Sequence, residues 1–370
     1  MNYQRMIMEV ESPEQIGYDR VRVNLAESSM RDRSLHDIGL DPATLGDLLL
    51  CYGDHRGSET LRSQIAADGC GALTPDDVLV TVGAAGALFL TATALLGPGD
   101  RLVVARPNYA SNLETPRAID ADIAYLELAF DAGYQVDLDR LAALITPETK
   151  LVSLTSPHNP TGAVIPQSDL AEIVRMVERA ETWLLLDETY RELSDEIHPP
   201  ASTLSDRVIS VSSLSKTYGV PGIRVGWVTC RNRDLMTTLL AAQEQAALAH
   251  SILDIAVAEH VLAHRDRLLP EIRAHIGAQR KIMSNWIAGD NRVEWVEPKG
   301  GVVCFPRFAD PKIDARAIYA RLQTDGIFLG PGWWFEQEPR HMRIGFGYPT
   351  PTELKTALTA ISETLDNASS

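Results

Sequence analysis

The stretch SSLSKTYGVPGIRVGW, residues 212–227, joins two apolar runs through a polar loop. It begins where the apolar run RVISVS (207–212) ends, and it leads into a second apolar run at Val225. Lys216 and Arg224 lie in the loop between these runs. Ligands of open α/β sheets bind just beyond the ends of the strands, so two cationic side chains at this position indicate a binding site.

Lys216 differs in its setting from the other five lysines of the chain. It follows a buried run and has the hydroxyls of Ser213, Ser215 and Thr217 beside it. A lysine held partly out of water has a lowered pKa, and its neutral amine can attack a carbonyl group. The other lysines lie on polar stretches or turns, where we expect exposure to solvent: Lys150, Lys281, Lys299, Lys312 and Lys355.

Apolar runs alternate with helical stretches from about residue 56 to 230, on both sides of this loop. Runs that are apolar throughout suit strands covered by helices on both faces. The pattern predicts an open, mainly parallel α/β sheet. Its candidate strands are VLVTV (78–82), RLVVA (101–105), KLVSLT (150–155), WLLLD (183–187), RVISVS (207–212) and VGWVT (225–229).

After residue 233 the sequence becomes rich in Ala and Leu and helical as far as about Trp286, with breaks expected near His250 and Pro270. Beyond it, short apolar runs alternate with helical stretches, which is an α+β pattern. We therefore expect a large domain, a connecting helix and a smaller domain to which the N-terminal residues contribute. The expected bounds are 46–255 for the large domain, 256–284 for the connecting helix, and 1–45 with 285–370 for the small domain.

Composition narrows the class of protein. The chain has 370 residues, 45% of them hydrophobic, and a formal net charge of −16. Its basic residues are scattered, whereas nucleic-acid binding needs a concentrated positive face, so no nucleic-acid partner is expected.

The chain has neither a signal-peptide pattern at its start nor an apolar run long enough to span a bilayer, so we expect no membrane contact and a cytoplasmic location. Its four cysteines lack metal-ligand spacing, so each is expected to pack as a small apolar residue without metal.

The turn TVGAAGAL (81–88) lies between a strand and a helix. Small side chains at Gly83, Ala84 and Ala85 let backbone N–H groups reach an anion at the helix N-terminus, where the helix dipole also favours negative charge. A plain tight turn explains the same residues equally well.

Three further strand ends carry polar residues. Asn159 follows a buried strand in SPHNPTG, although Asn-Pro and Thr-Gly are also ordinary turn signals. Asp187 ends the run LLLD, with Tyr190 three residues later, and its carboxylate needs either a charged partner or a role as helix N-cap. Arg343, within the short strand MRIGFG, suits a bidentate clamp on a carboxylate.

Taken in this order, NPTG, the Asp-x-x-Tyr of DETY, the Ser-x-x-Lys of SLSK and Arg224 resemble the class I/II aminotransferases, which are fold-type I enzymes dependent on pyridoxal 5'-phosphate. The resemblance runs from about Tyr52 to Arg343. It implies a large domain whose mainly parallel sheet lies between helices, plus a smaller α+β domain. It also implies an enzyme that transfers the amino group of an L-amino acid to a 2-oxo acid.

The resemblance assigns roles around the cofactor ring. Lys216 would form the Schiff base with the cofactor and then act as general base. Asp187 would pair with the protonated pyridine nitrogen, while Asn159 and Tyr190 would hydrogen-bond the phenolic oxygen. Tyr109, in RPNYAS, is similar to the aromatic residue that stacks on the ring.

The resemblance also assigns the phosphate, the subunit contact and the substrate carboxylate. The phosphate would rest on the turn Gly83–Ala85, with Ser213, Ser215 and Arg224 adding bonds. Tyr52, in CYGDHRG, is similar to a tyrosine that reaches the phosphate of the neighbouring subunit, which implies a homodimer. Arg343 would bind the α-carboxylate of the substrate, next to Asn159.

The N-terminal segment NLAESSMRD replaces the Gly and Pro segment of many aminotransferases, so Glu27, Ser28 and Ser29 are candidates for the substrate pocket. This segment and the chain length are similar to the branch that contains capreomycidine synthase, which acts on an arginine derivative. Glu27 would then attract a cationic side chain, or it is a solvated loop residue.

Three other functions were compared with the sequence: one stays open, and two lack features that they require. A lyase or cyclase acting at Cβ or Cγ, for example on an arginine derivative, shares the same cofactor chemistry, and the sequence does not separate it from a transaminase. A serine nucleophile at Ser213 with Lys216, as in penicillin-binding enzymes, would need Ser-Asp-Asn and Lys-Thr-Gly motifs that the sequence lacks. A transcriptional regulator on this fold would need an added DNA-binding domain, and we expect no room for one before residue 52.

Overall fold

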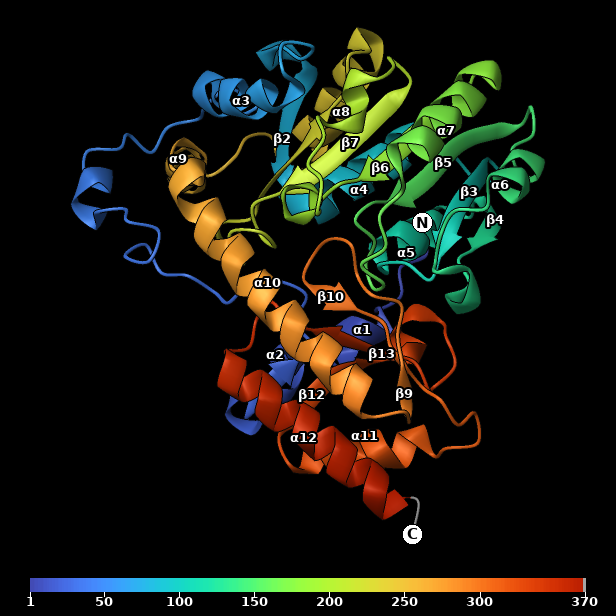
Figure 1. Ribbon diagram of the computed structural model, residues 1–370. Helices are drawn as coiled ribbons and strands as arrows, with labels where there is room; N and C mark the ends of the chain where they lie inside the picture. Colours follow the sequence, from blue (N-terminus) through green and yellow to red (C-terminus); the bar gives the residue numbers. More distant parts are fainter. Residues whose placement is uncertain (369–370) are drawn as a thin grey trace.

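The central feature of the large domain is a sheet in the order β2-β8-β7-β6-β5-β3-β4, found in the computed structural model, which describes residues 1–368 (Figure 1). Strand β8 is antiparallel to β2 and β7, whereas the other pairings are parallel. The expected mainly parallel α/β sheet is therefore confirmed. Its strands are β2 (Val78–Val82), β3 (Arg101–Arg106), β4 (Asp122–Glu127), β5 (Thr149–Thr155), β6 (Trp183–Asp187), β7 (Val208–Ser213) and β8 (Val225–Thr229).

Helices cover both faces of this sheet, which explains why its strands are apolar throughout. Successive side chains of a strand point to opposite faces. In β3, Leu102 and Val104 pack with α4, α5 and α8, whereas Val103 and Ala105 pack with α6 and α7. Edge strand β4 was missed from the sequence because DIAYLE mixes exposed polar and half-buried residues. The helices of this domain are α3 (Glu59–Ala66), α4 (Gly83–Leu95), α5 (Ser111–Ile119), α6 (Leu138–Leu144), α7 (Gln167–Arg179), α8 (Arg233–Ala246) and α9 (Ile252–Ala263).

The smaller domain is an α+β unit to which both ends of the chain contribute. Strand β1 from the N-terminal part pairs in parallel with β12, with Val23 opposite Ile327. The sheet order is β1-β12-β13-β10, and β9 pairs with β11. Helix α10 runs beside this domain (Figure 1). The elements are α1 (Ile7–Val10), α2 (Pro13–Ile16), β1 (Val23–Leu25), α10 (Arg265–Gly289), β9 (Val293–Glu294), β10 (Val303–Cys304), β11 (Arg307–Phe308), α11 (Ala315–Thr324), β12 (Ile327–Pro331), β13 (Met342–Gly345) and α12 (Pro351–Ala368).

Short 3-10 helices complete the fold and connect the main elements. They are η1 (Tyr18–Arg20), η2 (Pro42–Leu45), η3 (Ala67–Gly69), η4 (Pro75–Asp77), η5 (Phe130–Ala132), η6 (Arg191–Leu193), η7 (Ala201–Thr203), η8 (Pro221–Ile223) and η9 (Gly332–Phe335). None of the helices formed by residues 1–368 combines the length and the apolar character that crossing a bilayer requires.

The break expected near His250 is confirmed, because α8 ends at Ala246 and α9 begins at Ile252. Two other local expectations were wrong. A further break lies at His264, between α9 and α10, whereas Pro270 lies inside α10 without ending it. Proline removes only one backbone donor, and the helix continues past it on the following bonds. Cys230 and Cys304 are buried as expected, but Cys51 and Cys70 are exposed because they lie in surface turns.

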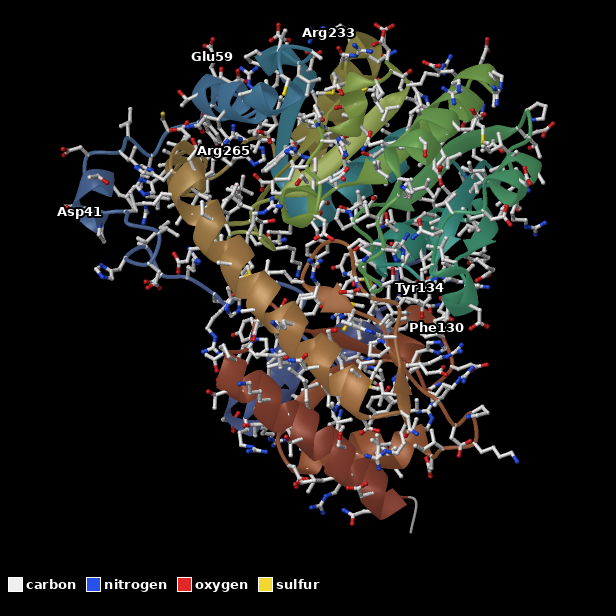
Figure 2. All side chains as sticks on the ribbon, viewed as in Figure 1. Asp41, Glu59, Phe130, Tyr134, Arg233 and Arg265 are labelled. Atoms are coloured by element: carbon white, nitrogen blue, oxygen red, sulfur yellow. The ribbon has the colours of Figure 1, made fainter. Side chains whose placement is uncertain are left out.

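An aromatic contact joins the two domains beside β4. Figure 2 labels Phe130 and Tyr134, whose ring centroids lie 5.7 Å apart in an edge-to-face arrangement. The Tyr134 hydroxyl donates to the backbone oxygen of Phe305 of the small domain at 3.4 Å. The Arg307 guanidinium lies 3.7 Å from the centroid of the Phe130 ring. Such ring and cation–π contacts dock the small domain against the large one.

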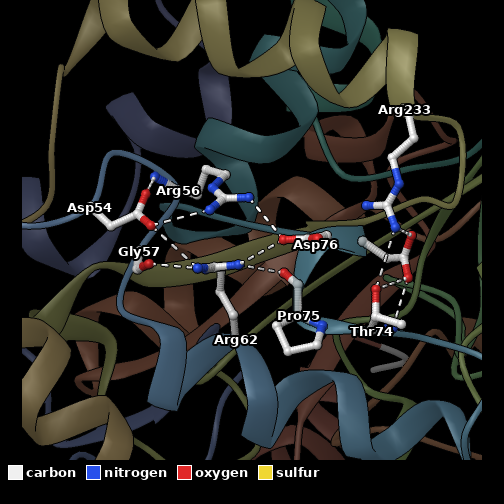
Figure 3. A network of polar contacts seen from close by, with 9 residues as sticks. Asp54, Arg56, Gly57, Arg62, Thr74, Pro75, Asp76 and Arg233 are labelled. Atoms are coloured by element: carbon white, nitrogen blue, oxygen red, sulfur yellow. Dashed lines mark hydrogen bonds and ion pairs between the residues drawn. The ribbon is translucent and has the colours of Figure 1, made fainter.

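A polar network holds the chain segment that precedes β2 (Figure 3). The buried Arg62 side chain donates to the backbone oxygens of Gly57 at 3.0 Å and Pro75 at 2.7 Å, and it pairs with Asp54 at 3.3 Å. Arg56 pairs with Asp76 at 3.0 Å. A buried guanidinium is tolerated only when its donors are satisfied, so this network fixes the backbone directly after Tyr52.

Gly345 provides a test of the packing between β13 and the chain after β1. A Cβ atom at Gly345 would lie 1.7 Å from the backbone oxygen of Glu27. We expect Gly345→Ala to lower the free energy of unfolding by about 2 kcal/mol or more, because overpacking forces the backbone apart. Urea and thermal unfolding of the cofactor-free protein measure the change.

Gly277→Ala, in α10, is the matched control, because a Cβ atom there would meet nothing within 4 Å. It is expected to raise the free energy of unfolding by about 0.5–1 kcal/mol through the better helix propensity of alanine. Equal stability of the two variants would contradict the packing argument.

Candidate active site

A cavity of about 250 Å³ lies at the strand-end edge of the large sheet, facing the small domain. Most of the site residues predicted from the sequence line it together. These are Glu27, Ala84, Ala85, Tyr109, Asn159, Asp187, Tyr190, Ser213, Ser215, Lys216, Arg224 and Arg343, and Ser28 also lines it.

The topology of the sheet explains this convergence. Asp187 is the last residue of β6 and Ser213 the last residue of β7, and the two strands are parallel. Arg224 directly precedes β8, and β8 runs antiparallel to β7, so the start of β8 lies at the same edge. The carboxyl ends of parallel strands meet at one edge, which collects residues that are far apart in sequence.

The turn from β2 into α4 forms a backbone cradle beside Arg224. Gly83 has a φ of +67°, and a Cβ atom there would lie 2.6 Å from Arg224 Nη2. At Gly226 of β8, a Cβ atom would lie 2.5 Å from the backbone nitrogen of Ala84. Glycine is therefore required on both sides of this contact. The N-terminus of α4 with an adjacent guanidinium fits a phosphate group.

Lys216 alone among the lysines faces the cavity. Its side chain is 30% exposed, and Nζ lies 3.4 Å from Glu27 Oε1. Burial acts to lower the pKa of Lys216, but Glu27, Tyr190 and Tyr109 together outweigh burial, so the pKa is raised from its ordinary value. The lowered pKa expected from the sequence is therefore corrected for the cofactor-free chain. The remaining lysines are exposed as expected: Lys150, Lys281, Lys299, Lys312 and Lys355.

Glu27 is an ionised partner of this lysine. Burial acts to raise the pKa of Glu27, but Lys216, Arg343 and the backbone N–H of Ser28 lower it below its ordinary value. The Ser28 N–H donates to Glu27 Oε1 at 2.8 Å. The carboxylate is thus neither a solvated loop group nor free, because its charge is balanced by the lysine.

Asp187 is a buried acid with hydrogen bonds but no ion pair within residues 1–368. Its Oδ1 accepts from the Thr189 N–H at 3.1 Å and from the Thr189 hydroxyl at 2.6 Å. Burial raises the pKa of Asp187 from its ordinary value, against opposing effects of Thr189 and Lys216. A protonated ring nitrogen beside it would supply the missing positive charge and hold the carboxylate ionised, so this residue fits pyridoxal phosphate.

Arg343 enters the cavity from β13 of the small domain. Its Nη1 donates to Asn159 Oδ1 at 3.1 Å and its Nη2 to the backbone oxygen of Ala26 at 2.5 Å. The residue is 4% exposed, yet its Nε has no partner among the described residues. Burial lowers the pKa of Arg343 from its ordinary value. A buried guanidinium with an unused donor is suited to an anionic ligand.

Two tyrosines lie where the sequence alone could not place them. The Tyr190 hydroxyl donates to the backbone oxygen of Ser28 at 2.6 Å, so its proton is directed to the N-terminal segment. The residue also lines the cavity. Tyr52 is 82% exposed and does not line the cavity of its own chain. Gly83 and Ser29 also stay behind the lining residues.

Sequence reasoning missed a complete wall of the cavity. The short helices α1 and α2 contribute Met8, Glu9, Ser12, Pro13 and Glu14. Residues before about 45 have no clear period, so nothing in the sequence indicated this contribution.

Two further lining residues could have been found from the sequence, because they lie at strand ends: Thr155 ends β5 and Thr189 follows β6. The remaining lining residues are Ala26, Leu88, Pro221 and Trp334.

Comparisons with known proteins match this geometry. The family model described as aminotransferase class I and II matches residues 23–361. Capreomycidine synthase of Streptomyces vinaceus is 34% identical over 362 residues, which cover 94% of this chain and 91% of that protein. An arginine–pyruvate transaminase of Pseudomonas aeruginosa is 36% identical over 185 residues, which cover 48% of this chain and 47% of that protein.

Solved structures agree in fold over the whole chain. A PLP-dependent aminotransferase from Streptococcus suis superposes with a TM-score of 0.92 at 28% identity, covering 100% of this chain and 99% of the other. The PLP-dependent cyclase OrfR superposes with a TM-score of 0.89 at 29% identity, covering 99% and 98%. The fold-type I architecture and the cofactor implied by the sequence motifs are confirmed. The chain belongs to the aminotransferase class I and II family, whose enzymes depend on pyridoxal 5'-phosphate.

Proposed function

We propose that the protein transfers the amino group of an L-amino acid to a 2-oxo acid, with the cofactor attached covalently to Lys216. The observation that carries this proposal is the shared cavity of Lys216, the unpaired buried acid Asp187 and the under-bonded Arg343. A nucleophilic amine, an acid for a ring nitrogen and a clamp for a carboxylate are the three requirements of the reaction.

Residues of the large domain would hold the cofactor. The N-terminus of α4 at Ala84 and Ala85, with Ser213, Ser215 and Arg224, fits the phosphate. Asp187 fits the ring nitrogen, and Tyr109, which also lines the cavity, fits the face of the ring. When bound, pyridoxal phosphate supplies an electron-withdrawing ring that stabilises negative charge at the substrate Cα.

Lys216 would have a second role as the proton carrier. Its amine, once it is no longer bonded to the cofactor, would remove the proton from the substrate Cα and deliver it to the cofactor carbon that is bonded to the amino nitrogen. Glu27, at 3.4 Å from Nζ, governs how readily that amine is protonated. Asn159 and Tyr190 line the cavity beside the lysine and can bond to a phenolic oxygen of the ring.

Arg343 would bind and orient the α-carboxylate of the substrate. The guanidinium is held in place by Asn159 and by the backbone at Ala26, so its free donor points in a defined direction. Fixing the carboxylate determines which bond to Cα is aligned for breaking. Glu27 and Asn159 lie within reach of the same substrate end.

The proposed assembly is a homodimer with shared sites. Tyr52 belongs to a segment with large exposed side chains, Leu49 at 77%, Leu50 at 73% and Tyr52 at 82%. Contiguous exposed apolar residues are typical of an interface. The network at Arg62 anchors the chain beside them, so Tyr52 can be presented to the phosphate of a partner subunit.

A second candidate is elimination or cyclisation at Cβ or Cγ of an amino acid such as an arginine derivative. It is favoured by the similarity to capreomycidine synthase over 94% of this chain and to the cyclase OrfR. Product analysis separates the two candidates. A 2-oxo acid together with an aminated acceptor supports transamination, whereas a cyclised amino acid, or ammonia with pyruvate, supports the alternative.

Lys216→Ala tests the covalent attachment. The variant is expected to lose the visible absorbance of the attached cofactor and to lose amino transfer by about 10³-fold or more, because both the attachment and the proton carrier disappear. Absorbance spectra and single-turnover assays measure both. Lys281→Ala, at an exposed position, is the control. Unchanged absorbance in the Lys216 variant would refute the assignment.

Glu27→Gln tests the ion pair with Lys216. The carboxylate raises the lysine pKa, so its removal is expected to lower that pKa and to increase the neutral amine at a given pH. The rate at which the cofactor-free protein binds pyridoxal phosphate rises with pH as the lysine loses its proton. The midpoint of this rise should lie at lower pH in the variant than in the native protein. Stopped-flow absorbance across pH measures the midpoint. Asp41→Asn, at an exposed site, should leave the midpoint in place, and an upward shift in the Glu27 variant would contradict the argument.

Tyr52→Phe tests the shared site. Loss of a hydroxyl donor to the partner's phosphate is expected to weaken cofactor retention by roughly tenfold while the dimer stays intact. Equilibrium dialysis measures retention, and analytical ultracentrifugation measures the assembly. Tyr3→Phe, at a site that is 65% exposed, is the matched control. A monomeric native protein that retains its cofactor fully would exclude the proposal.

A further inference from the structure

We propose that Glu9 and Glu14 recognise a positive charge at the far end of the substrate side chain, so that the enzyme selects amino acids that end in a guanidinium or ammonium group. The inference rests on the proposed function, because it takes Arg343 to hold the α-carboxylate of an amino acid.

The two acids reach the cavity from a segment that carries none of the cofactor residues. Glu9 lies on α1 and Glu14 directly follows the start of α2, and both line the cavity that also contains Lys216 and Arg343. Figure 1 places α1 and α2 beside β12 and β13 of the small domain. The acids thus come from a different segment of the chain than the strand ends that fit the cofactor.

Neither carboxylate has a cationic partner within residues 1–368. The half-buried Glu9 side chain makes no hydrogen bond or ion pair there, and Glu14 accepts only from the Tyr18 hydroxyl at 3.1 Å. Burial and the charge of Glu14 raise the pKa of Glu9 from its ordinary value, against smaller opposing effects of Lys216 and Arg343. Like charges that face one cavity repel each other, and a cation between them relieves that repulsion.

Another residue that lines the cavity points independently to a ligand. Arg343 is 4% exposed, lines the cavity and has an Nε without a partner among the described residues. The cavity is therefore lined by a cation that suits an anionic group and, on the N-terminal segment, by two acids that suit a cationic one. An amino acid with a neutral side chain would satisfy Arg343 but would leave the half-buried Glu9 without a cation, next to the exposed Glu14.

Glu27 does not take this role, although the sequence suggested it. Its Oε1 is 3.4 Å from Lys216 Nζ, and its charge is balanced by that lysine. Recognition of a distant positive charge needs acids that are not already paired. Glu9 and Glu14 meet that condition, and Glu27 does not.

The acidic segment is held in place before any ligand arrives. Glu11 Oε2 accepts from Trp333 Nε1 at 2.9 Å and from Trp334 Nε1 at 2.6 Å. Met8, at 5% exposed, packs into the large-domain core. Because the residues between and beside the two acids are anchored, Glu9 and Glu14 are presented to the cavity with little entropy left to lose on binding.

The test compares L-arginine with L-citrulline, its neutral analogue of nearly equal shape. Each amino acid is titrated into the purified holoenzyme, and the change in cofactor absorbance gives the dissociation constant. The native enzyme should prefer L-arginine. Glu9→Gln and Glu14→Gln should each weaken L-arginine binding by roughly tenfold and leave L-citrulline binding nearly unchanged, because each removes one charge-assisted bond.

Asp19→Asn is the matched control, since it removes the same charge from η1, on the exposed surface beside the segment. It should leave both dissociation constants as they are. Salt provides a second measurement that does not depend on folding of a variant. Raising the salt concentration should weaken L-arginine more than L-citrulline in the native enzyme, and the difference should disappear in the Glu9→Gln/Glu14→Gln variant.

The outcomes separate this inference from the proposed function. If both amino acids bind but the preference for L-arginine is absent, or is unchanged in the double variant, the recognition role of Glu9 and Glu14 is refuted and the proposed function stands. If L-arginine, L-citrulline and L-alanine all leave the cofactor absorbance unaltered, the proposed function itself is refuted, and the inference with it.

Discussion

The contact between Lys216 and Glu27 is the interaction on which the site depends. The lysine comes from the edge of the large sheet, and the glutamate follows β1 of the small domain. Their 3.4 Å approach brings the two domains together over one cavity. It also stores the reactive amine in its protonated form until the cofactor arrives, because the carboxylate favours the ammonium. The same pairing keeps Glu27 ionised in spite of its burial.

Around this pair, the site holds several charged groups that the chain itself does not fully satisfy. Asp187 is a buried acid without a cation, Arg343 has an unused Nε, and Glu9 has no partner within the described residues. Such groups cost free energy in the folded chain and are concentrated where ligands bind. In the proposed function, the cofactor, the substrate carboxylate and a substrate cation would each supply one missing partner.

The fold and the cofactor end of the site could be predicted from the sequence because their signals are local. Most strands are continuous apolar runs, so the position where each strand ends can be located from the local sequence without knowledge of the rest of the fold. Asp187, Ser213, Lys216 and Asn159 were therefore found by position alone. The edge strand β4 was missed because half-exposed residues blur its apolar run, and Cys51 and Cys70 were misjudged because exposure depends on which turns reach the surface.

The sequence by itself determined the parallel sheet, the order of the motifs along it and the family, and it singled out Lys216 as the lysine proposed to carry the cofactor. Only the tertiary structure decided that Glu27 meets Lys216 across 189 residues, that this contact raises the lysine pKa, and that α1 and α2 turn Glu9 and Glu14 into the cavity. The physical reason is one of range. Hydrophobic periodicity and turn chemistry act over a few residues, whereas the charge that a side chain meets depends on how separate segments pack.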